Sequence, residues 1–432
     1  MSVSKDSLYL QPGYEPKKTD LICRWYIEPA EGMSLEDAAA NTVTESSIGT
    51  WTEIKTAKKY TQRLAAKVFR IDENTGIVDT AYPVEAYDPY DISCILASIA
   101  GNIFGMKCVN NLRLMDVRLP KEIVKAHQGP EFGIKGIRKL VKVPDRPLIG
   151  TIIKPKMGLN TKDHAQEAYD AWVGGVDIVK DDENLTGQKF NPFYKRVKET
   201  LKKRDRAERK TGERKMYMAN VTAATTDEII KRAEYVQKQG GEYIMIDVCI
   251  VGWPTLQTLR EHNEDLGLVL HAHRAMHAAY TRNEKHGISM LVLSKFLRLC
   301  GLDQLHIGSM VGKMVDAGPQ SVLRSRDALV GEDVPADDFA VGQKWYGMKS
   351  VFPVASGGLH PGHLPYLAKA FGNDVIIQMG GGIHGHPKGT VAGAKAARDM
   401  LYAVVGGVPP LEYKSRELQL AIKTWGMTED PV

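Results

Sequence analysis

Short apolar runs alternate with longer amphipathic segments from about residue 146 onward. The segments at 161–175, 225–241 and 391–407 have helical periodicity and end at glycine, as helix C-caps often do. The apolar runs are continuous rather than alternating, which is typical of parallel strands covered by helices. Eight such units predict a closed (β/α)8 TIM barrel. The runs lie at 147–153, 175–180, 215–221, 243–249, 266–273, 304–308, 351–356 and 374–381.

The first 140 residues have a different pattern. Their order is strand, helix, strand, strand, helix, strand, which predicts a ferredoxin-like α+β sandwich. We therefore expect a small α+β N-terminal domain over 1–140, and a TIM-barrel domain over 141–432 that ends in a helical tail at 415–425. The six N-terminal elements are expected at 20–29, 34–45, 67–73, 78–87, 91–101 and 106–120.

Composition narrows the class of protein. The chain has 432 residues and is 43% hydrophobic, and its net charge of +5 is too small to indicate nucleic-acid binding. A basic run at 195–215 contains acidic residues at helical spacing, so we interpret it as a solvated helix face. No signal-like start and no run long enough to span a bilayer is found, which predicts a cytoplasmic protein with no membrane partner. The cysteines lack CxxC pairs and are typical of buried free thiols; they are Cys23, Cys94, Cys108, Cys249 and Cys300.

Candidate chemistry starts at the first two strand ends, because TIM barrels carry their active sites there. Lys154 and Lys156 follow the first strand and share one side of an extended segment. The alternative is a pair of solvated surface lysines. After the second strand, Lys180 and Asp182 share a face and Glu183 can turn toward them. Hard carboxylate oxygens at this position favour Mg²⁺.

Lys180 is an electrostatically unfavourable neighbour for a metal cation. A protonated amine would repel the metal, so this lysine either pairs with the surplus carboxylate of Asp181 or is converted into an anion. The residues alone leave both alternatives open.

The fifth and sixth strands end in histidines. His273 and His277 are four residues apart, as in some zinc sites, but no HExxH motif or nearby cysteine supports zinc. A catalytic His273 beside an anion-binding Arg274 is favoured. His306 ends the sixth strand, and a glycine-flanked loop then carries Lys313. That lysine is either solvated or delivered to the site by a lid.

Glycine clusters follow the seventh and eighth strands, at 356–358 and 380–382. Many barrels bind phosphate after these strands, because glycine backbone lets N–H groups approach the anion. Glycine pairs also end ordinary strands, so each cluster alone indicates little. With Arg274 opposite, the two clusters predict a ligand with two phosphates, with the metal and the lysines between them.

The order and spacing of these motifs resemble the large chain of ribulose-1,5-bisphosphate carboxylase/oxygenase. The N-terminal segments "ESSIGTWT" (45–52) and "GNIFGMK" (101–107) agree, and the resemblance covers about 20–425. The short C-terminus is more similar to archaeal form III chains than to plant-type chains. The barrel motifs are "GTIIKPKMGL", "GGVDIVKDDENL", "HAHRAMHAAY", "HIGSMVGKM", "PVASGGLHPGHLP" and "IIQMGGGIHGHPKG".

The resemblance implies that Lys180 reacts with a non-substrate CO2 to form a carbamate. This anion would hold Mg²⁺ together with Asp182 and Glu183, and would act as the base that forms the Mg-bound enediolate. Lys154 would protonate the C2 carbanion with support from Lys156. His273 would shuttle protons.

The remaining implied roles concern the substrate and a second subunit. Lys313 would stabilise the added carboxylate. The resemblance implies a homodimer, or a ring of dimers, with shared active sites and no small subunit. Substrate contacts would come from Arg274, His306, Ser356, Gly357, Gly358, Gln378, Gly380 and Gly381, and from Glu45, Thr50, Trp51 and Asn102 of the neighbouring subunit.

The implied function is conversion of ribulose 1,5-bisphosphate, CO2 and water into two molecules of 3-phosphoglycerate, with O2 as a competing co-substrate and with AMP salvage as the setting. The alternatives are a carboxylase-like enolase or isomerase acting on another sugar phosphate, and a non-catalytic bisphosphate binder. Both are disfavoured because no matched catalytic position is lost. Ile152, Gln304 and Met379 differ from plant-type chains and bear on CO2/O2 selectivity.

Overall fold

The computed structural model describes residues 8–52, 54–313 and 318–428. The chain forms two compact units. The first unit also contains two segments from later in the chain. It comprises Met1–Gly129, Met276–Cys300 and Asp327–Met348, and the second comprises Pro130–Ala275, Gly301–Arg326 and Lys349–Val432.

The first unit is built on a five-stranded sheet with the order β10-β4-β1-β3-β2. The predicted ferredoxin-like order of elements is confirmed, with antiparallel pairing of β1 to both β3 and β4. The second strand of the predicted pair, expected to reach residue 87, ends at Tyr82. Pro83 lacks the backbone N–H that a continued ladder needs. A short strand, β10, adds in parallel to β4 and was not predicted. The sheet and its two predicted helices comprise β1 (Leu21–Pro29), α1 (Leu35–Glu45), β2 (Lys67–Asp72), β3 (Ile77–Tyr82), α2 (Ile92–Ile99), β4 (Val109–Arg118) and β10 (Gly287–Ile288). The unit also contains α3 (Lys121–Ala126), α10 (Ala278–Thr281), α11 (Met290–Cys300), β12 (Asp333–Val334) and β13 (Gln343–Lys344).

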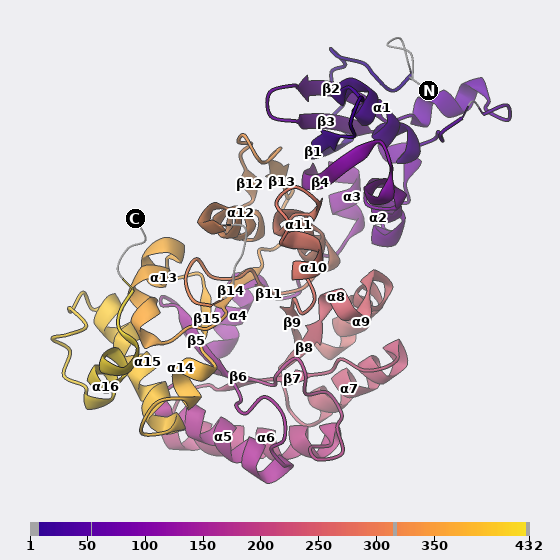
Figure 1. Ribbon diagram of the computed structural model, residues 1–432. Coiled ribbons are helices and arrows are strands. Elements are labelled where there is room, and N and C mark those ends of the chain that lie inside the picture. The colour runs from indigo at the N-terminus through magenta and orange to yellow at the C-terminus, as the bar shows by residue number, and fades with distance from the viewer. Residues whose placement is uncertain (1–7, 53, 314–317, 429–432) are drawn as a thin grey trace. The chain divides into compact units, whose positions relative to one another are not determined.

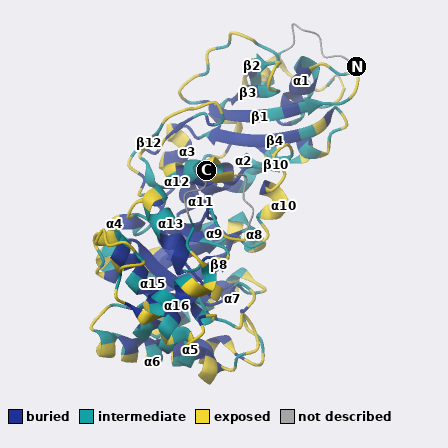
Figure 2. Ribbon diagram, turned by 60° about the vertical axis from the view of Figure 1, so that its left-hand side comes forward, coloured by how far each residue is buried: buried dark blue, intermediate teal, exposed yellow. Residues whose placement is uncertain are grey.

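The second unit is a closed barrel of eight parallel strands in chain order, with β15 closing onto β5. The predicted TIM barrel is therefore confirmed, and all eight strands fall within the predicted runs. Figure 1 shows the strands inside a ring of helices, and Figure 2 shows how thoroughly this centre is buried. The strands are β5 (Leu148–Ile152), β6 (Ile178–Lys180), β7 (Met216–Asn220), β8 (Tyr243–Asp247), β9 (Val269–His273), β11 (Gln304–His306), β14 (Phe352–Ser356) and β15 (Ile376–Gln378).

The helices around the barrel pack in sequence, with α5 between α6 and α15. Asn160 caps α5 through its side chain, and Gly175 ends it as expected. By contrast, the C-cap of α7 is Gln239 and not the following glycine. The helices are α4 (Gly133–Val141), α5 (Thr161–Gly174), α6 (Phe193–Thr211), α7 (Thr226–Lys238), α8 (Val248–Val251), α9 (Trp253–Leu266), α12 (Gly318–Val330), α13 (Leu364–Phe371), α14 (Gly381–His384), α15 (Thr390–Val405) and α16 (Arg416–Trp425).

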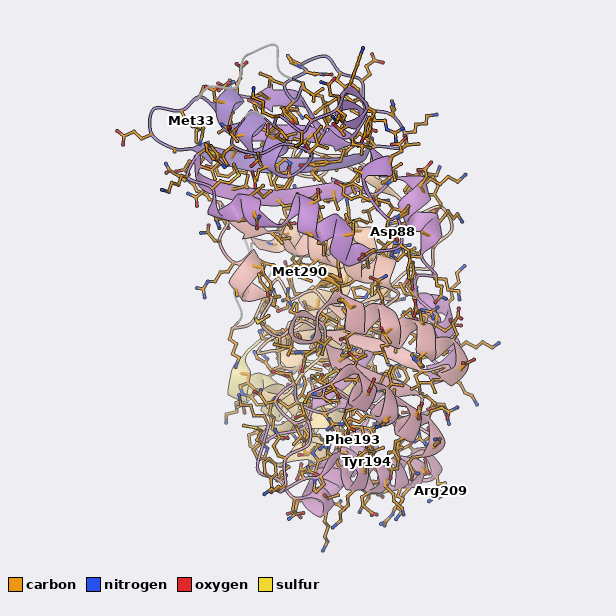
Figure 3. The ribbon with its side chains drawn as sticks, turned by 90° about the vertical axis from the view of Figure 1, so that its right-hand side faces the viewer. Met33, Asp88, Phe193, Tyr194, Arg209 and Met290 are labelled. Atoms are coloured by element: carbon orange, nitrogen blue, oxygen red, sulfur yellow. The ribbon has the colours of Figure 1, made fainter. Side chains whose placement is uncertain are left out.

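The basic run lies on α6, where Phe193 and Tyr194 mark the start and Arg209 the end (Figure 3). The interpretation as a wholly solvated face was wrong at three basic positions. Arg196 and Arg204 on α6 are buried and paired with Asp181 and Asp205, and Lys215, just after the helix, is buried and paired with Glu213.

Two further sequence expectations can be compared with the structure. Across residues 8–52, 54–313 and 318–428, no helix has both the length and the apolar character needed to cross a membrane. The cysteines are free, but only Cys23 and Cys300 are buried; Cys94, Cys108 and Cys249 are partly exposed. The expectation of free thiols is confirmed, and the expectation that they are buried was wrong for three of them.

Candidate active site

The carboxylate of Asp181 is fully buried and bound on several sides at the end of β6. Arg196 Nε lies 3.0 Å from Oδ2, and the Tyr217 hydroxyl donates to Oδ1 at 2.7 Å. The Asn220 backbone N–H donates to Oδ2 at 3.0 Å, and His164 Nε2 lies 3.1 Å from Oδ1. Burial alone would raise the pKa of Asp181, but the Arg196 charge and these contacts bring that pKa well below its usual range. Asp181 is therefore an ionised structural carboxylate.

Lys180 is also fully buried, and its closest partner is not a carboxylate. Nζ donates to the backbone oxygen of Asp181 at 2.8 Å and lies 3.7 Å from Glu183 Oε2. Burial lowers the pKa of Lys180, and the carboxylates of Glu183 and Asp182 only partly offset this. The alternative of an ion pair between Lys180 and Asp181 is wrong, because Arg196 and Tyr217 already occupy that carboxylate.

Asp182 faces the first strand end. Its Oδ2 lies 2.7 Å from Lys154 Nζ, while Oδ1 accepts from the backbone and side-chain N–H groups of Asn184 at 3.1 and 2.9 Å. Burial raises the pKa of Asp182 less than Lys154 and Asn184 lower it, so the net shift is downward. The structure thus brings Lys154 and the candidate metal ligands of β6 together. Lys156 is exposed in the loop that follows β5.

Glu183 connects β6 to a histidine and carboxylate pair. Its Oε2 lies 3.5 Å from His273 Nε2, and His273 Nδ1 lies 3.0 Å from Asp247 Oδ1. Asp247 Oδ2 in turn accepts from the Thr222 hydroxyl at 3.3 Å. A carboxylate on Nδ1 holds the imidazole ring so that Nε2 faces the mouth of the barrel. Asp247, the contact of His273 Nδ1, was missed by sequence reasoning, although its place at the end of β8 was a usable signal.

The neighbouring strands contribute a hydrogen-bonded set of polar side chains. His306 Nδ1 lies 2.6 Å from Ser356 Oγ, and His306 Nε2 lies 2.8 Å from His271 Nε2. His271 Nδ1 lies 2.9 Å from Gln304 Oε1. The predicted residues His306 and Ser356 are therefore in contact, and His271 and Gln304 extend the set into the barrel.

The loop after β11 meets the glycine cluster after β14. The Lys313 backbone N–H donates to Gly357 O at 3.1 Å. A Cβ atom on Gly358 would lie 2.5 Å from Lys313 Cγ, so only glycine permits this approach. Lys313 is exposed, and Met314, the end of the predicted loop motif, lies outside the described residues.

The remaining predicted positions of the second unit are distributed around the mouth of the barrel. Gly380 lies against Lys154, since a Cβ there would come within 3.0 Å of Lys154 Cε. Gln378 is buried, and its Nε2 lies 3.9 Å from Met218 Sδ. Arg274 is buried after β9, and the exposed Gly381 begins α14.

Four predicted substrate residues belong to the first unit. Glu45 is the last residue of α1, Thr50 and Trp51 follow it, and Asn102 begins a short 3-10 helix. Trp51 is 82% exposed. His277 also lies in the first unit, where its Nδ1 contacts Thr281 Oγ1 at 2.9 Å.

Comparison with known proteins agrees with this geometry. Residues 133–425 match the model of the ribulose bisphosphate carboxylase large chain, catalytic domain, and 8–123 match that of its N-terminal domain. The ribulose bisphosphate carboxylase of Methanosarcina mazei is 51% identical over 422 residues, covering 96% of this chain and 98% of the relative. That of Pyrococcus abyssi is 46% identical over 423 residues, covering 97% and 96%.

Two solved structures are similar throughout. The dimeric archaeal Rubisco of Hyperthermus butylicus has a TM-score of 0.92 at 41% identity and covers 98% of this chain and 100% of that chain. The octameric Rubisco of Pyrococcus horikoshii has a TM-score of 0.90 at 44% identity, covering 98% and 97%. The match over both domains and nearly the full length shows that the chain belongs to the ribulose bisphosphate carboxylase large-chain family, in its archaeal, form III-like branch.

Proposed function

We propose that this chain carboxylates ribulose 1,5-bisphosphate, adding CO2 and water and cleaving the C2–C3 bond to give two molecules of 3-phosphoglycerate. Family membership and the names of the archaeal relatives support the reaction. O2 would compete with CO2 for the same enediolate, so an oxygenase side reaction is expected.

The environment of Lys180 is the observation that carries the proposal. Its amine is buried, its pKa is lowered by burial, and the adjacent Asp181 carboxylate is bound by other residues. A neutral amine is the form that attacks CO2, forming an N–C bond and releasing one proton. The product is a carbamate anion next to Asp182 and Glu183.

This set of residues fits Mg²⁺ once the carbamate is present. Within the part of the chain that the structure describes, no three histidine, cysteine, aspartate or glutamate side chains form a metal-binding group. Asp182 and Glu183 are therefore an incomplete set, and a carbamate on Lys180 would add the third anionic oxygen. Bound Mg²⁺ would supply positive charge to offset the charge that develops on the C2 and C3 oxygens of the substrate.

The other residues of the mouth would move protons and hold the substrate. The Lys180 carbamate would take the C3 proton, and Lys154, whose Nζ lies 2.7 Å from Asp182, would return a proton to C2 with support from the charge of Lys156. His273, oriented by Asp247, would carry protons during hydration. Lys313 would stabilise the new carboxylate. Phosphates and hydroxyls would be bound by Arg274, His306, Ser356, Gly357, Gly358, Gln378, Gly380 and Gly381.

We infer that the N-terminal domain, residues 1–140, completes the active site of a second subunit, while residues 141–432 form the catalytic domain. Glu45, Thr50, Trp51 and Asn102 would be the contributed residues, and the 82% exposure of the Trp51 side chain supports a role in covering a partner surface. A homodimer or a ring of dimers without a small subunit follows. The similar chains from H. butylicus and P. horikoshii are dimeric and octameric respectively.

We place the source of the bisphosphate in AMP and nucleotide salvage, on the strength of the likeness to archaeal relatives. A cell extract from the source organism, given labelled AMP, phosphate and bicarbonate, should yield labelled 3-phosphoglycerate only when this chain is active. The same yield without it would contradict this setting.

A fixation assay tests the proposed reaction. The protein is incubated without O2 with Mg²⁺, labelled bicarbonate and ribulose 1,5-bisphosphate, and acid-stable label is measured in 3-phosphoglycerate. Lys180→Met should abolish incorporation and keep the fold, because a thioether cannot form a carbamate. Lys162→Met, at an exposed lysine on α5, should leave the rate unchanged. No fixation by the wild type would refute the proposal.

A further inference from the structure

Four side chains from three neighbouring strands form one continuous hydrogen-bonded chain inside the barrel. Gln304 Oε1 lies 2.9 Å from His271 Nδ1, His271 Nε2 lies 2.8 Å from His306 Nε2, and His306 Nδ1 lies 2.6 Å from Ser356 Oγ. Gln304 and His271 are opposite each other in the pairing of β11 with β9. All but Ser356 are buried, so this hydrogen-bonded series of side chains extends from the barrel interior to its mouth.

Both imidazoles are neutral, which gives the chain a direction. Burial, the largest cause, lowers the pKa of His271 and His306 well below the usual range. A neutral imidazole has one N–H donor and one bare nitrogen acceptor. With the Gln304 amide oriented so that Oε1, which can only accept, faces His271, the His271 proton is on Nδ1 and its Nε2 accepts; in this orientation Gln304 Nε2 is buried with no hydrogen-bond partner.

The remaining protons then have only one arrangement. His306 donates from Nε2 to His271, so its Nδ1 is bare and accepts the Ser356 hydroxyl proton. The Ser356 oxygen therefore turns only lone pairs toward the mouth of the barrel. A Gln304 amide turned by 180° would present its N–H group to His271 and would reverse every bond of the chain.

We propose that Gln304 is a positioning residue, acting through His271 and His306, that makes Ser356 a hydrogen-bond acceptor for a hydroxyl group of the sugar bisphosphate. The inference rests on the proposed function for the identity of that ligand. The direction of the four-residue hydrogen-bonded series does not depend on the proposed function. A substrate hydroxyl that donates is selected, and an analogue with a carbonyl oxygen at that position is disfavoured, since two acceptors would face each other.

Neutron diffraction from deuterium-exchanged crystals of the unaltered protein tests the direction. Deuterons are expected on His271 Nδ1, on His306 Nε2 and on Ser356 Oγ, the last pointing at His306 Nδ1. A deuteron on His306 Nδ1 would overturn the proposal. This map needs neither substrate nor turnover, so it decides the matter even if Gln304→Met does not fold or the proposed reaction fails.

A double-mutant cycle tests the consequence for the substrate. Gln304→Met keeps the side-chain volume and removes the acceptor, so KM for ribulose 1,5-bisphosphate should rise by roughly three- to tenfold, with kcat within about twofold. In a Ser356→Ala background the same substitution should raise KM by a clearly smaller factor, because only the substrate contact proposed for His306 is left to be affected. An equal rise in both backgrounds would show a packing role and overturn the proposal. Absence of turnover in the wild type would instead refute the proposed function.

Discussion

Lys180 donates to the backbone oxygen of its neighbour Asp181 at 2.8 Å and makes no ion pair with the Asp181 carboxylate. That carboxylate is bound by Arg196, Tyr217 and the backbone of Asn220. The consecutive residues Lys180, Asp181 and Asp182 therefore have separate tasks. Asp181 fixes the strand end, which leaves Lys180 and Asp182 available for chemistry.

The Asp181 network should contribute strongly to stability. Arg196→Met leaves a buried carboxylate without its countercharge and should lower the free energy of unfolding by about 3–5 kcal/mol. Tyr217→Phe removes one hydrogen bond and should cost about 1–3 kcal/mol. Urea unfolding of both variants measures the difference. Equal, small losses would mean that Arg196 does not compensate Asp181.

Lys154 should compete with the metal for Asp182, because its Nζ lies 2.7 Å from Oδ2. Lys154→Met should therefore strengthen Mg²⁺ binding in the presence of bicarbonate by roughly two- to fivefold. Turnover should fall by about 10²-fold or more, since the proposed proton donor to C2 is lost. Calorimetric titration and steady-state kinetics measure the two effects, with Lys162→Met as the control that changes neither. Weaker Mg²⁺ binding by Lys154→Met would contradict this role.

Gly358 should control the position of Lys313. Gly358 has a φ of +78°, and an added Cβ would lie 2.9 Å from the Lys313 backbone N. Gly372 has a similar φ of +69° with nothing within 4 Å of an added Cβ, which makes it a matched control. Alanine at either site should cost about 1–3 kcal/mol of stability through backbone strain at positive φ, and Gly358→Ala should cost more because its Cβ would also meet the Lys313 backbone. Only Gly358→Ala should also lower kcat, and equal kcat values for the two variants would refute the link to Lys313.

His363 should make the fold sensitive to acid. Its Nδ1 accepts the backbone N–H of His360 at 3.1 Å, a bond that protonation of Nδ1 would break. Burial, together with the neighbouring His360, lowers the pKa of His363 to about 4. The unfolded chain, with a histidine pKa of about 6.5, binds the proton more tightly, so this contribution to stability is lost as pH falls from about 6.5 to about 4.

Because of His363, the free energy of unfolding should be about 1–2 kcal/mol lower at pH 5 than at pH 7.5. His363→Gln keeps an acceptor but cannot titrate, so it should weaken the dependence of unfolding free energy on pH. Urea titrations at the two pH values measure this. An unchanged pH dependence in the variant would assign the acid sensitivity to other groups.

Most of the fold could be predicted because buried parallel strands leave a continuous apolar signal. All eight barrel strands were found in this way, and the capped helix α5 was found by its periodicity. The two-residue strand β10 was missed, because Gly287 and Ile288 carry no pattern and pair only when the chain folds back to β4.

The site could be predicted where a residue type at a strand end has few other uses. Lys154, Lys180, Asp182 and His273 were proposed on that basis, and the structure links them through Lys154–Asp182 and through the contacts of Lys180 and His273 with Glu183. The different environments of Asp181 and Asp182 could not be predicted from the sequence. The Asp181 carboxylate is bound by Arg196, which lies fifteen positions later on a helix whose arginines all look solvated in the sequence. Asp247 was overlooked because a single carboxylate after an apolar run is common.

Carbamylation of Lys180 is the central step of the proposed chemistry, and ¹³C NMR tests it most directly. The protein is equilibrated with ¹³C-bicarbonate and Mg²⁺, and a protein-bound carbamate signal is sought in the wild type and in Lys180→Met. We expect one such signal in the wild type that grows as pH rises, because the neutral amine reacts, and none in the variant. No bound signal in the wild type, or the same signal in Lys180→Met, would contradict the assignment of Lys180 as the anion that completes the magnesium site.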